Sequence, residues 1–311
     1  MKDTACIAID LGATSGRVIL AKMKHGRLET EILNRFPNVI KEIDGRCYWD
    51  IYSLFDSIKE GLNMAASRRI AIDSIGVDTW GVDFVCVRPD GSFVSLPRAY
   101  RDPYTEGVPE QYFRHIPREE VYRLTGIQFM NFNSLFQLYA MRLEGSIDID
   151  GVRSILFMPD AISYLLTGKE VCEYTILSTS QLMNPETCRI EERLLEPLQI
   201  PVEKFPLSIA WYTMFAGMDK NEKGDKNNYS SYIELNYPFS VKSVDLNVTC
   251  GIVPYKAPQY YTNGFAVTNV ALKGSYTIKI TDSFSLPIFS QVIWNPRMED
   301  AHIVFGITLK P

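Results

Sequence analysis

The apolar and polar positions along the first two thirds of the chain follow two different periods. Three β-type segments come first, and the short connections between them favour antiparallel neighbours: "ACIAIDLG", "GRVILAKMK" and "RLETEILNRF". A helical period follows, in which apolar residues recur three or four positions apart: Ile51, Leu54, Phe55, Ile58, Leu62 and Ala65. With Asp50 as its cap, this spacing predicts a helix that buries one stripe.

Strand-like and helical patterns alternate through the next part of the chain. Two strand-like pieces surround the Thr-Trp-Gly turn at residues 79–81, and "RPDG" closes the second piece. Helical patterns then run from about Pro117 through "NFNSLFQLYAMRLEG" and "FMPDAISYLLTG", which ends on Gly168, and a shorter one in "ETCRIEERLLEPLQI" stops near Pro201. This alternation predicts an α/β domain over residues 1–209.

The pattern changes after Ile209. The polar stretch "GMDKNEKGDKNNYSS" predicts a linker over residues 210–231. Beyond it, segments that alternate or are rich in β-branched residues predict an all-β segment over residues 232–311, either a partial barrel or a sandwich. We find no internal repeat across this boundary.

Composition limits the classes of function. A chain of 311 residues with 46% hydrophobic side chains can fill the cores of two ordinary domains. Its net charge of −5, with lysines and arginines scattered along the chain, argues against nucleic acid as a partner. The N-terminus lacks the features of a signal peptide, and no continuous apolar span of about 20 residues occurs. We therefore expect a cytoplasmic protein that has no membrane partner and acts on small molecules.

Cysteines and histidines show no metal-ligand spacing. The six cysteines form no CxxC pair, and we expect them to be reduced thiols. Each of the three histidines is isolated from other ligand-type residues: His25, His115 and His302.

The turn after the first strand segment has the chemistry of a phosphate-binding hairpin. Its residues leave backbone N–H groups uncovered and add two hydroxyls: Gly12, Ala13, Thr14, Ser15 and Gly16. Arg17 can add a fork of donors, and Asp10 at the strand end can hold Mg²⁺ or its water shell. The alternative is an ordinary β-turn with hydroxyls that make only turn hydrogen bonds.

A second cluster, "GVDTWGVDF" at residues 76–84, suits a sugar. Asp78 and Asp83 flank the aromatic plane of Trp80 and the side-chain-free Gly81, and polar residues follow on a loop: Arg98, Arg101 and Asp102. Sugars need hydrogen-bonding groups for their hydroxyls and an aromatic surface for the apolar ring face. The alternative is a strand with polar residues on its exposed face and Trp80 in the core.

Six phrases between Asp10 and Gly168 resemble, in order, the N-terminal domain of the FGGY carbohydrate kinase family, in particular its L-rhamnulose kinases. They are "DLGATSGR", "YWDIYSLFDSIKEGL", "IGVDTWGVDFV", "PRAYRDPYT", "TGIQFMNFNSLFQLYA" and "FMPDAISYLLTG". The resemblance implies an actin-like, ribonuclease H-type domain. It also implies transfer of the γ-phosphate of ATP to the 1-hydroxyl of L-rhamnulose, with Mg²⁺.

The same resemblance assigns roles to individual residues. It implies an ATP-phosphate loop formed by Ala13, Thr14, Ser15, Gly16 and Arg17. It places Asp10 near the metal and the transferred phosphate, and it makes Gly81 a sugar-contacting glycine, with further sugar neighbours at Trp80, Asp83 and Asp102.

The chain departs from the family after Ile209. The family's general base is the Asp of a His-Asp pair at the start of a second domain, and here the three histidines are followed by Gly26, Ile116 and Ile303. No catalytic base is therefore assigned, and we expect no useful kinase activity from this chain alone. The alternative function is a binding module that holds sugar and phosphate without turnover.

The last segment has its own resemblance, to the C-terminal end of a bacterial outer-membrane β-barrel. It rests on strands of alternating polarity, on the terminal "HIVFGITL" and on aromatics near strand ends: Tyr255, Tyr260, Tyr261, Phe284 and Trp294. A soluble β-sandwich fits these features as well. The sequence thus suggests a fusion of two unrelated fragments, and a fragment of an outer-membrane protein is the third hypothesis for the chain.

Overall fold

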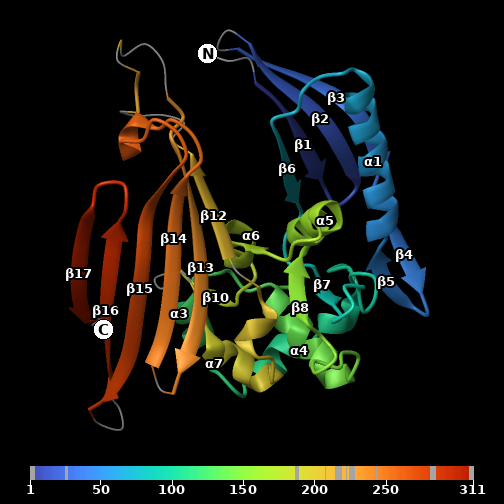
Figure 1. The fold of residues 1–311 in the computed structure, drawn as a ribbon. Coiled ribbons are helices and arrows are strands. Elements are labelled where there is room, and N and C mark those ends of the chain that lie inside the picture. The colour runs from blue at the N-terminus through green and yellow to red at the C-terminus, as the bar shows by residue number, and fades with distance from the viewer. Residues whose placement is uncertain are drawn as a thin grey trace. The chain divides into compact units, whose positions relative to one another are not determined.

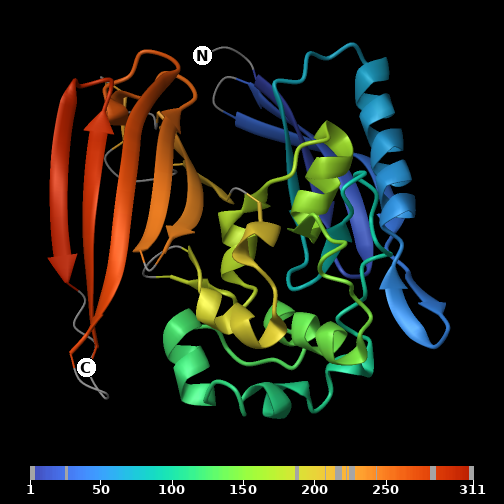
Figure 2. The same cartoon turned by 60° about the horizontal axis from the view of Figure 1, so that its bottom comes forward.

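The chain divides into two compact units, Met1–Pro206 (unit 1) and Leu207–Pro311 (unit 2) (Figures 1 and 2). The structure, a computed structural model, describes residues 4–24, 27–185, 189–206, 208–213, 219–221, 223, 228–242, 244–280 and 285–307. The division falls close to the limit at Ile209 that the sequence predicts. His25, Cys188 and Phe284 lie outside the described residues.

Unit 1 begins with a mixed sheet in the order β3-β2-β1-β6. The three predicted N-terminal strands are confirmed as antiparallel neighbours. The fourth strand pairs with β1 in parallel, which the local sequence pattern does not foretell. The bounds are β1 Thr4–Leu11, β2 Ser15–Lys24, β3 Arg27–Pro37 and β6 Ser74–Thr79.

The predicted helix is confirmed as α1, Ile51–Ser67, which lies along this sheet (Figure 1). Asp50 caps it by accepting a hydrogen bond from the Ser53 N–H. Gly61 allows the close approach of the helix, because a Cβ there would lie 2.6 Å from Cβ of Val18 on β2. A short hairpin precedes the helix, made of β4 Ile40–Ile43 and β5 Arg46–Trp49.

The rest of unit 1 packs around a second pair of strands, β7 Phe84–Val87 and β8 Ser154–Phe157. The predicted helices are present here as α3 Arg118–Thr125, α4 Ser134–Glu144, α5 Met158–Thr167, which ends at Gly168, and α7 Glu192–Leu195. The shorter elements are η1 Pro103–Thr105, α2 Val108–Tyr112, β9 Cys172–Glu173, α6 Tyr174–Ser178, β10 Met183–Asn184, β11 Arg189–Ile190, η2 Glu196–Leu198 and η3 Val202–Lys204. Two apolar cores form, one under α1 and α5 and one around α4.

The described residues of unit 2 form an antiparallel meander, in which each strand pairs with the next along the chain (Figure 2). The strands are β12 Ser208–Thr213, β13 Ser231–Val241, β14 Val244–Val253, β15 Ala266–Lys279, β16 Ser285–Asn295 and β17 Asp300–Ile307, with the 3-10 turn η4 Pro258–Tyr260. The predicted linker over 210–231 is too long at its start. Residues 210–213 continue β12, because "SIAWYT" is a β-type run that pairs with β13.

Within the described part of the chain, no helix is both long enough and apolar enough to cross a bilayer. Five cysteines in that part are free thiols: Cys6, Cys47, Cys86, Cys172 and Cys250.

Candidate functional site

The predicted phosphate hairpin is the β1–β2 connection at the edge of the first sheet. Leu11 pairs with Gly16 at its base, and the Gly12 N–H donates to the Ser15 carbonyl at 2.9 Å. Thr14 is exposed at the tip, and Ala13 and Ser15 are half-buried beside it. Small side chains thus leave the backbone at the tip open to a ligand.

Asn38, which no sequence motif marks, fixes this tip. Its side-chain amide donates to the Gly12 carbonyl at 2.9 Å, and its backbone N–H donates to the Thr14 carbonyl at 3.0 Å. The side chain is 7% exposed. The shape of the turn therefore depends on a residue 26 positions along the chain from Gly12.

Gly16 is required by packing. A Cβ at this position would lie 2.3 Å from the ring of Phe36 on β3 and 2.8 Å from Cδ2 of Leu11. Its place in the predicted phosphate loop thus has a structural reason that is independent of any ligand.

Charged residues form a row across the sheet next to the hairpin tip. Direct pairing places Arg35, Arg17, Asp10 and Asp78 side by side on the four strands, and directly paired residues share one face of a sheet. Arg17 Nη2 lies 2.7 Å from Asp10 Oδ2. The parallel pairing of β1 with β6 is what brings Asp78 beside Asp10.

The carboxylates of this row have the chemistry of a magnesium site. Mg²⁺ is commonly held by one or two carboxylates together with water and substrate phosphates. Asp10 and Asp78 supply such oxygens on neighbouring strands. Among the described residues, no three His, Cys, Asp or Glu side chains gather as a metal cage, so any cation here would take part of its shell from a ligand.

The second predicted cluster begins where β6 ends. Thr79 pairs with Leu11, so the Trp80–Gly81 turn and the phosphate hairpin leave neighbouring strands at the same edge of the sheet. In α/β sheets, ligands bind beyond the carboxyl ends of the strands. The fold thereby brings together the two motifs that the sequence singles out.

Gly81 faces Thr179, which follows α6. A Cβ on Gly81 would lie 3.3 Å from Oγ1 of Thr179 and 3.9 Å from Cδ1 of Ile176. Gly81 does not have the left-handed backbone that favours glycine. The turn therefore lies close to Thr179, which is exposed, and the missing side chain leaves the surface in front of Thr179 free of a protruding group.

Asp83 lies behind this turn as the centre of a buried hydrogen-bond network. Its Oδ2 accepts from Trp49 Nε1 at 2.6 Å, from Trp80 Nε1 at 2.9 Å and from the Tyr100 N–H at 3.2 Å. Its Oδ1 accepts from Gln137 Nε2 at 2.8 Å. The side chain is 1% exposed, and burial raises the pKa of Asp83 to about 6 against the opposing effect of these donors.

Aromatic side chains surround the turn. The rings of Trp49 and Trp80 lie 4.5 Å apart, and those of Tyr100 and Phe132 lie 5.3 Å apart. Trp49 is fully buried, whereas Trp80, Tyr100 and Phe132 keep part of their surface exposed. The half-exposed rings offer the kind of apolar plane that a sugar ring stacks on.

Asp102 is also buried and fully used by the fold. Its Oδ2 accepts from the Cys47 N–H at 2.7 Å, and its Oδ1 accepts from Arg98 Nη2 at 3.1 Å and from the Tyr104 N–H at 3.0 Å. The structure therefore places Asp83 and Asp102 in the interior of unit 1, whereas Trp80 and Gly81 stay partly exposed.

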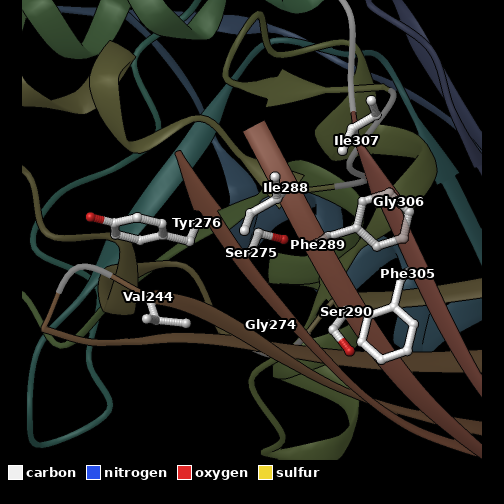
Figure 3. Close-up of a pocket in the computed structure, with 10 residues that line it drawn as sticks. All are labelled: Val244, Gly274, Ser275, Tyr276, Ile288, Phe289, Ser290, Phe305, Gly306 and Ile307. Carbon is white, nitrogen blue, oxygen red and sulfur yellow. The ribbon is translucent and has the colours of Figure 1, made fainter. Parts of the chain in front are cut away.

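Unit 2 carries a hollow of different chemistry, of about 700 Å³, on the sheet of β14 to β17 (Figure 3). Its walls are mainly apolar, and no charged side chain lines it: Val244, Gly274, Ser275, Tyr276, Ile288, Phe289, Ser290, Phe305, Gly306 and Ile307. Such a lining offers no counter-charge for a phosphate and few partners for sugar hydroxyls. We take the sheet edge of unit 1, where the two sequence motifs meet, as the candidate functional site.

Comparison with known proteins identifies a family for the first two thirds of the chain. Residues 5–216 match the N-terminal domain of the FGGY family of carbohydrate kinases. The chain belongs to this family. The matched range contains the hairpin, the charged row and the Gly81 turn.

The FGGY relatives include rhamnulokinases. The rhamnulokinase of Bacteroides thetaiotaomicron is 53% identical over 198 residues, which are 64% of this chain and 41% of that protein. The rhamnulokinase of Yersinia pestis (strain Pestoides F) is 43% identical over 201 residues, which are again 64% of this chain and 41% of that protein. The aligned part thus spans 41% of the length of either relative.

Solved structures of sugar kinases share the fold at low identity. A xylulose kinase from Lactobacillus acidophilus gives a TM-score of 0.57 at 14% identity, over 80% of this chain and 60% of that chain. A gluconate kinase from the same organism gives a TM-score of 0.58 at 14% identity, over 89% of this chain and 60% of that chain. These neighbours support the predicted actin-like, mixed α/β architecture.

Proposed function

We propose that unit 1 is the part of an L-rhamnulose kinase that binds the phosphates of ATP and the sugar. The observation that carries the proposal is the shared sheet edge. Leu11 and Thr79 are paired, so the phosphate hairpin and the Gly81 turn start side by side. The identity to rhamnulokinases supports L-rhamnulose as the sugar.

At the hairpin, we assign the phosphate oxygens to the backbone N–H groups of residues 13–16 and to the Arg17 guanidinium. Ala13, Thr14 and Ser15 are small and at least partly exposed, whereas Gly16 is buried at the base of the hairpin. Guanidinium binds phosphate oxygens through paired donors. Asp10, with Asp78 beside it, would hold Mg²⁺ together with ATP oxygens. The ion would neutralise charge on the transferred phosphate.

At the Gly81 turn, we assign the sugar to the space in front of Thr179. Gly81 leaves this space free, and Trp80 offers a half-exposed ring. We assign Asp83 and Asp102 to holding the site from behind, because protein donors already occupy their carboxylate oxygens. Thr179 and Gln137 are not among the residues that the sequence motifs predict for this site.

For the 311-residue chain assayed alone, we propose binding with little or no turnover. Phosphoryl transfer depends mainly on positioning, and a general base adds about 10²–10⁴-fold. None of the three histidines precedes an Asp. The absence of this pair favours the second candidate function, a module that binds sugar and phosphate without turnover. Attachment to an outer-membrane fragment stays a prediction from the sequence.

A coupled assay of ADP release tests this proposal. The full chain is given ATP, Mg²⁺ and L-rhamnulose, with a no-sugar control and a full-length rhamnulokinase as the positive control. We expect release at the level of the no-sugar control, together with a raised melting temperature in the presence of each ligand. Magnesium-dependent ADP release above the control would refute the lack of turnover, and no melting shift with either ligand would refute binding.

A further inference from the structure

The residue after Gly81 has an unusual backbone. Val82 has φ of 70°, in the left-handed region. A β-branched residue is strongly disfavoured there, because its side chain crowds the backbone. Such a conformation persists only when its surroundings enforce it, and it is often found at ligand sites.

The first turn of α4 supplies the enforcing contacts. The Val82 carbonyl accepts from Ser134 Oγ at 2.7 Å and from Gln137 Nε2 at 3.3 Å. The same Gln137 amide donates to Asp83 and to the Phe132 carbonyl, both at 2.8 Å, so its longer bond to Val82 is a shared one and Ser134 makes the main contact. Ser134 and Gln137 are 0% and 1% exposed, so their bonds to Val82 and Asp83 are shielded from competing water.

The same helix end also holds the segment opposite Gly81. The Leu135 N–H donates to the Ser180 carbonyl at 3.2 Å, and Asn133 Nδ2 donates to Gln181 Oε1 at 2.9 Å. Ser180 directly follows Thr179, the residue that faces Gly81. One turn of helix is therefore bonded to both sides of the space assigned to the sugar.

We infer that Ser134 and Gln137 are positioning residues for the sugar. By holding Val82 in the left-handed conformation, they fix the direction of the Gly81 backbone and its spacing from Thr179. The inference rests on the proposed role of Gly81 in sugar binding. If Val82 relaxed to an ordinary φ, the Gly81–Val82 peptide would rotate and the shape of the space would change.

The Val82→Gly variant separates this role from a merely structural one. Glycine adopts the left-handed region without strain, so the fold keeps its stability while the turn gains freedom. We expect the melting temperature to stay within a few degrees of wild type and the affinity for L-rhamnulose to fall about tenfold, because the bound turn must now be ordered on binding. Arg69→Gly is the matched control, since Arg69 also has positive φ, of 53°, just beyond the end of α1.

Gln137→Met and Ser134→Ala test the contacts themselves, with the exposed Gln111→Met as control. Titration calorimetry of the full chain with L-rhamnulose, and separately with ATP and Mg²⁺, gives the affinities. We expect both variants to lose sugar affinity and to keep ATP affinity. If Gln137→Met fails to fold, the sugar affinities of Ser134→Ala and Val82→Gly test the inference. Wild-type sugar affinity in Val82→Gly and Ser134→Ala would overturn the inference alone, whereas a wild-type chain that binds no sugar would overturn the proposed function as well.

Discussion

Arg17 and Asp10 face each other across the first hairpin, with Arg17 Nη2 and Asp10 Oδ2 2.7 Å apart. Their side chains are 40% and 36% exposed, and exposed ion pairs contribute little to stability. We propose that the pair serves ligand binding, in which Arg17 would turn to a phosphate and Asp10 to a cation.

Replacing Arg17 by alanine is expected to weaken ATP binding by about tenfold or more while changing the free energy of unfolding by less than about 1 kcal/mol. Titration calorimetry and chemical denaturation measure the two quantities. Arg68→Ala is the control, because Arg68 also forms an exposed ion pair, with Glu31 of the same unit. Equal ATP affinity in both variants would contradict a phosphate-binding role for Arg17.

Two glycines of the hairpin are expected to respond differently to alanine. Gly16→Ala should destabilise unit 1 by about 1–3 kcal/mol, because its Cβ would overlap Phe36 and Leu11. Gly12→Ala should cost much less, since its Cβ would meet only the Ser15 carbonyl, at 3.4 Å. Urea unfolding compares the two variants, and similar losses would argue against the packing role of Gly16.

Asn38→Ala is expected to loosen the phosphate hairpin. It removes the side-chain bond to the Gly12 carbonyl, at a cost of about 0.5–1.5 kcal/mol in stability, and ATP affinity should fall severalfold. Asn34→Ala is the matched control, because Asn34 Nδ2 donates at 2.8 Å to the Ser57 carbonyl on α1, away from the hairpin tip. Thermal unfolding and ATP titration of both variants separate a loss of stability from a loss of binding. An unchanged ATP affinity in Asn38→Ala would contradict the role of Asn38 in holding the hairpin for ATP.

Asp160 on α5 is expected to make stability fall as the pH rises. Its side chain is 2% exposed, Oδ2 has no hydrogen-bond partner, and burial raises its pKa to about 8. The folded state therefore holds a proton that the unfolded chain releases near pH 4. The contribution of protonated Asp160 to the free energy of unfolding is fully present below about pH 4 and is lost as the pH rises towards about 8.

Asp160→Asn should remove that dependence. At about pH 8 the variant should be more stable than wild type by about 1–3 kcal/mol, and at about pH 4 the difference should vanish or reverse. Urea unfolding across this range measures the effect, with the exposed Asp56→Asn as control. Parallel stability curves for wild type and Asp160→Asn would show that Asp160 does not titrate in this way.

The sequence predicts the local elements of this site well and its long-range contacts poorly. The β1–β2 hairpin and the cap of α1 follow from neighbouring residues, and the structure confirms both. Two contacts join segments that are far apart in the chain. One is the parallel pairing that puts Asp78 beside Asp10, and the other is the hydrogen bonding of Asn38 to the hairpin. No periodicity reports such contacts.

The roles of acidic residues are the hardest to predict. A carboxylate near an aromatic residue looks the same in a sequence whether it faces a ligand or the interior. Asp83 and Asp102 are predicted as neighbours of the sugar, and the structure shows both buried among protein donors. The donors to Asp83 come from Trp49, Tyr100 and Gln137, which are distant in sequence, so its burial could not be foreseen.

Titration of L-rhamnulose into the full chain and its Gly81→Ala variant tests sugar binding at the Trp80–Gly81 turn most directly. A Cβ on Gly81 would enter the space in front of Thr179 with only a small adjustment of that side chain, so the variant should fold. Gly76→Ala on β6 is the control, because its Cβ would meet no atom within 4 Å. We expect saturable binding by wild type and Gly76→Ala, and affinity weaker by about tenfold or more in Gly81→Ala. Absence of binding by wild type, or equal affinity in Gly81→Ala, would contradict sugar binding at this turn.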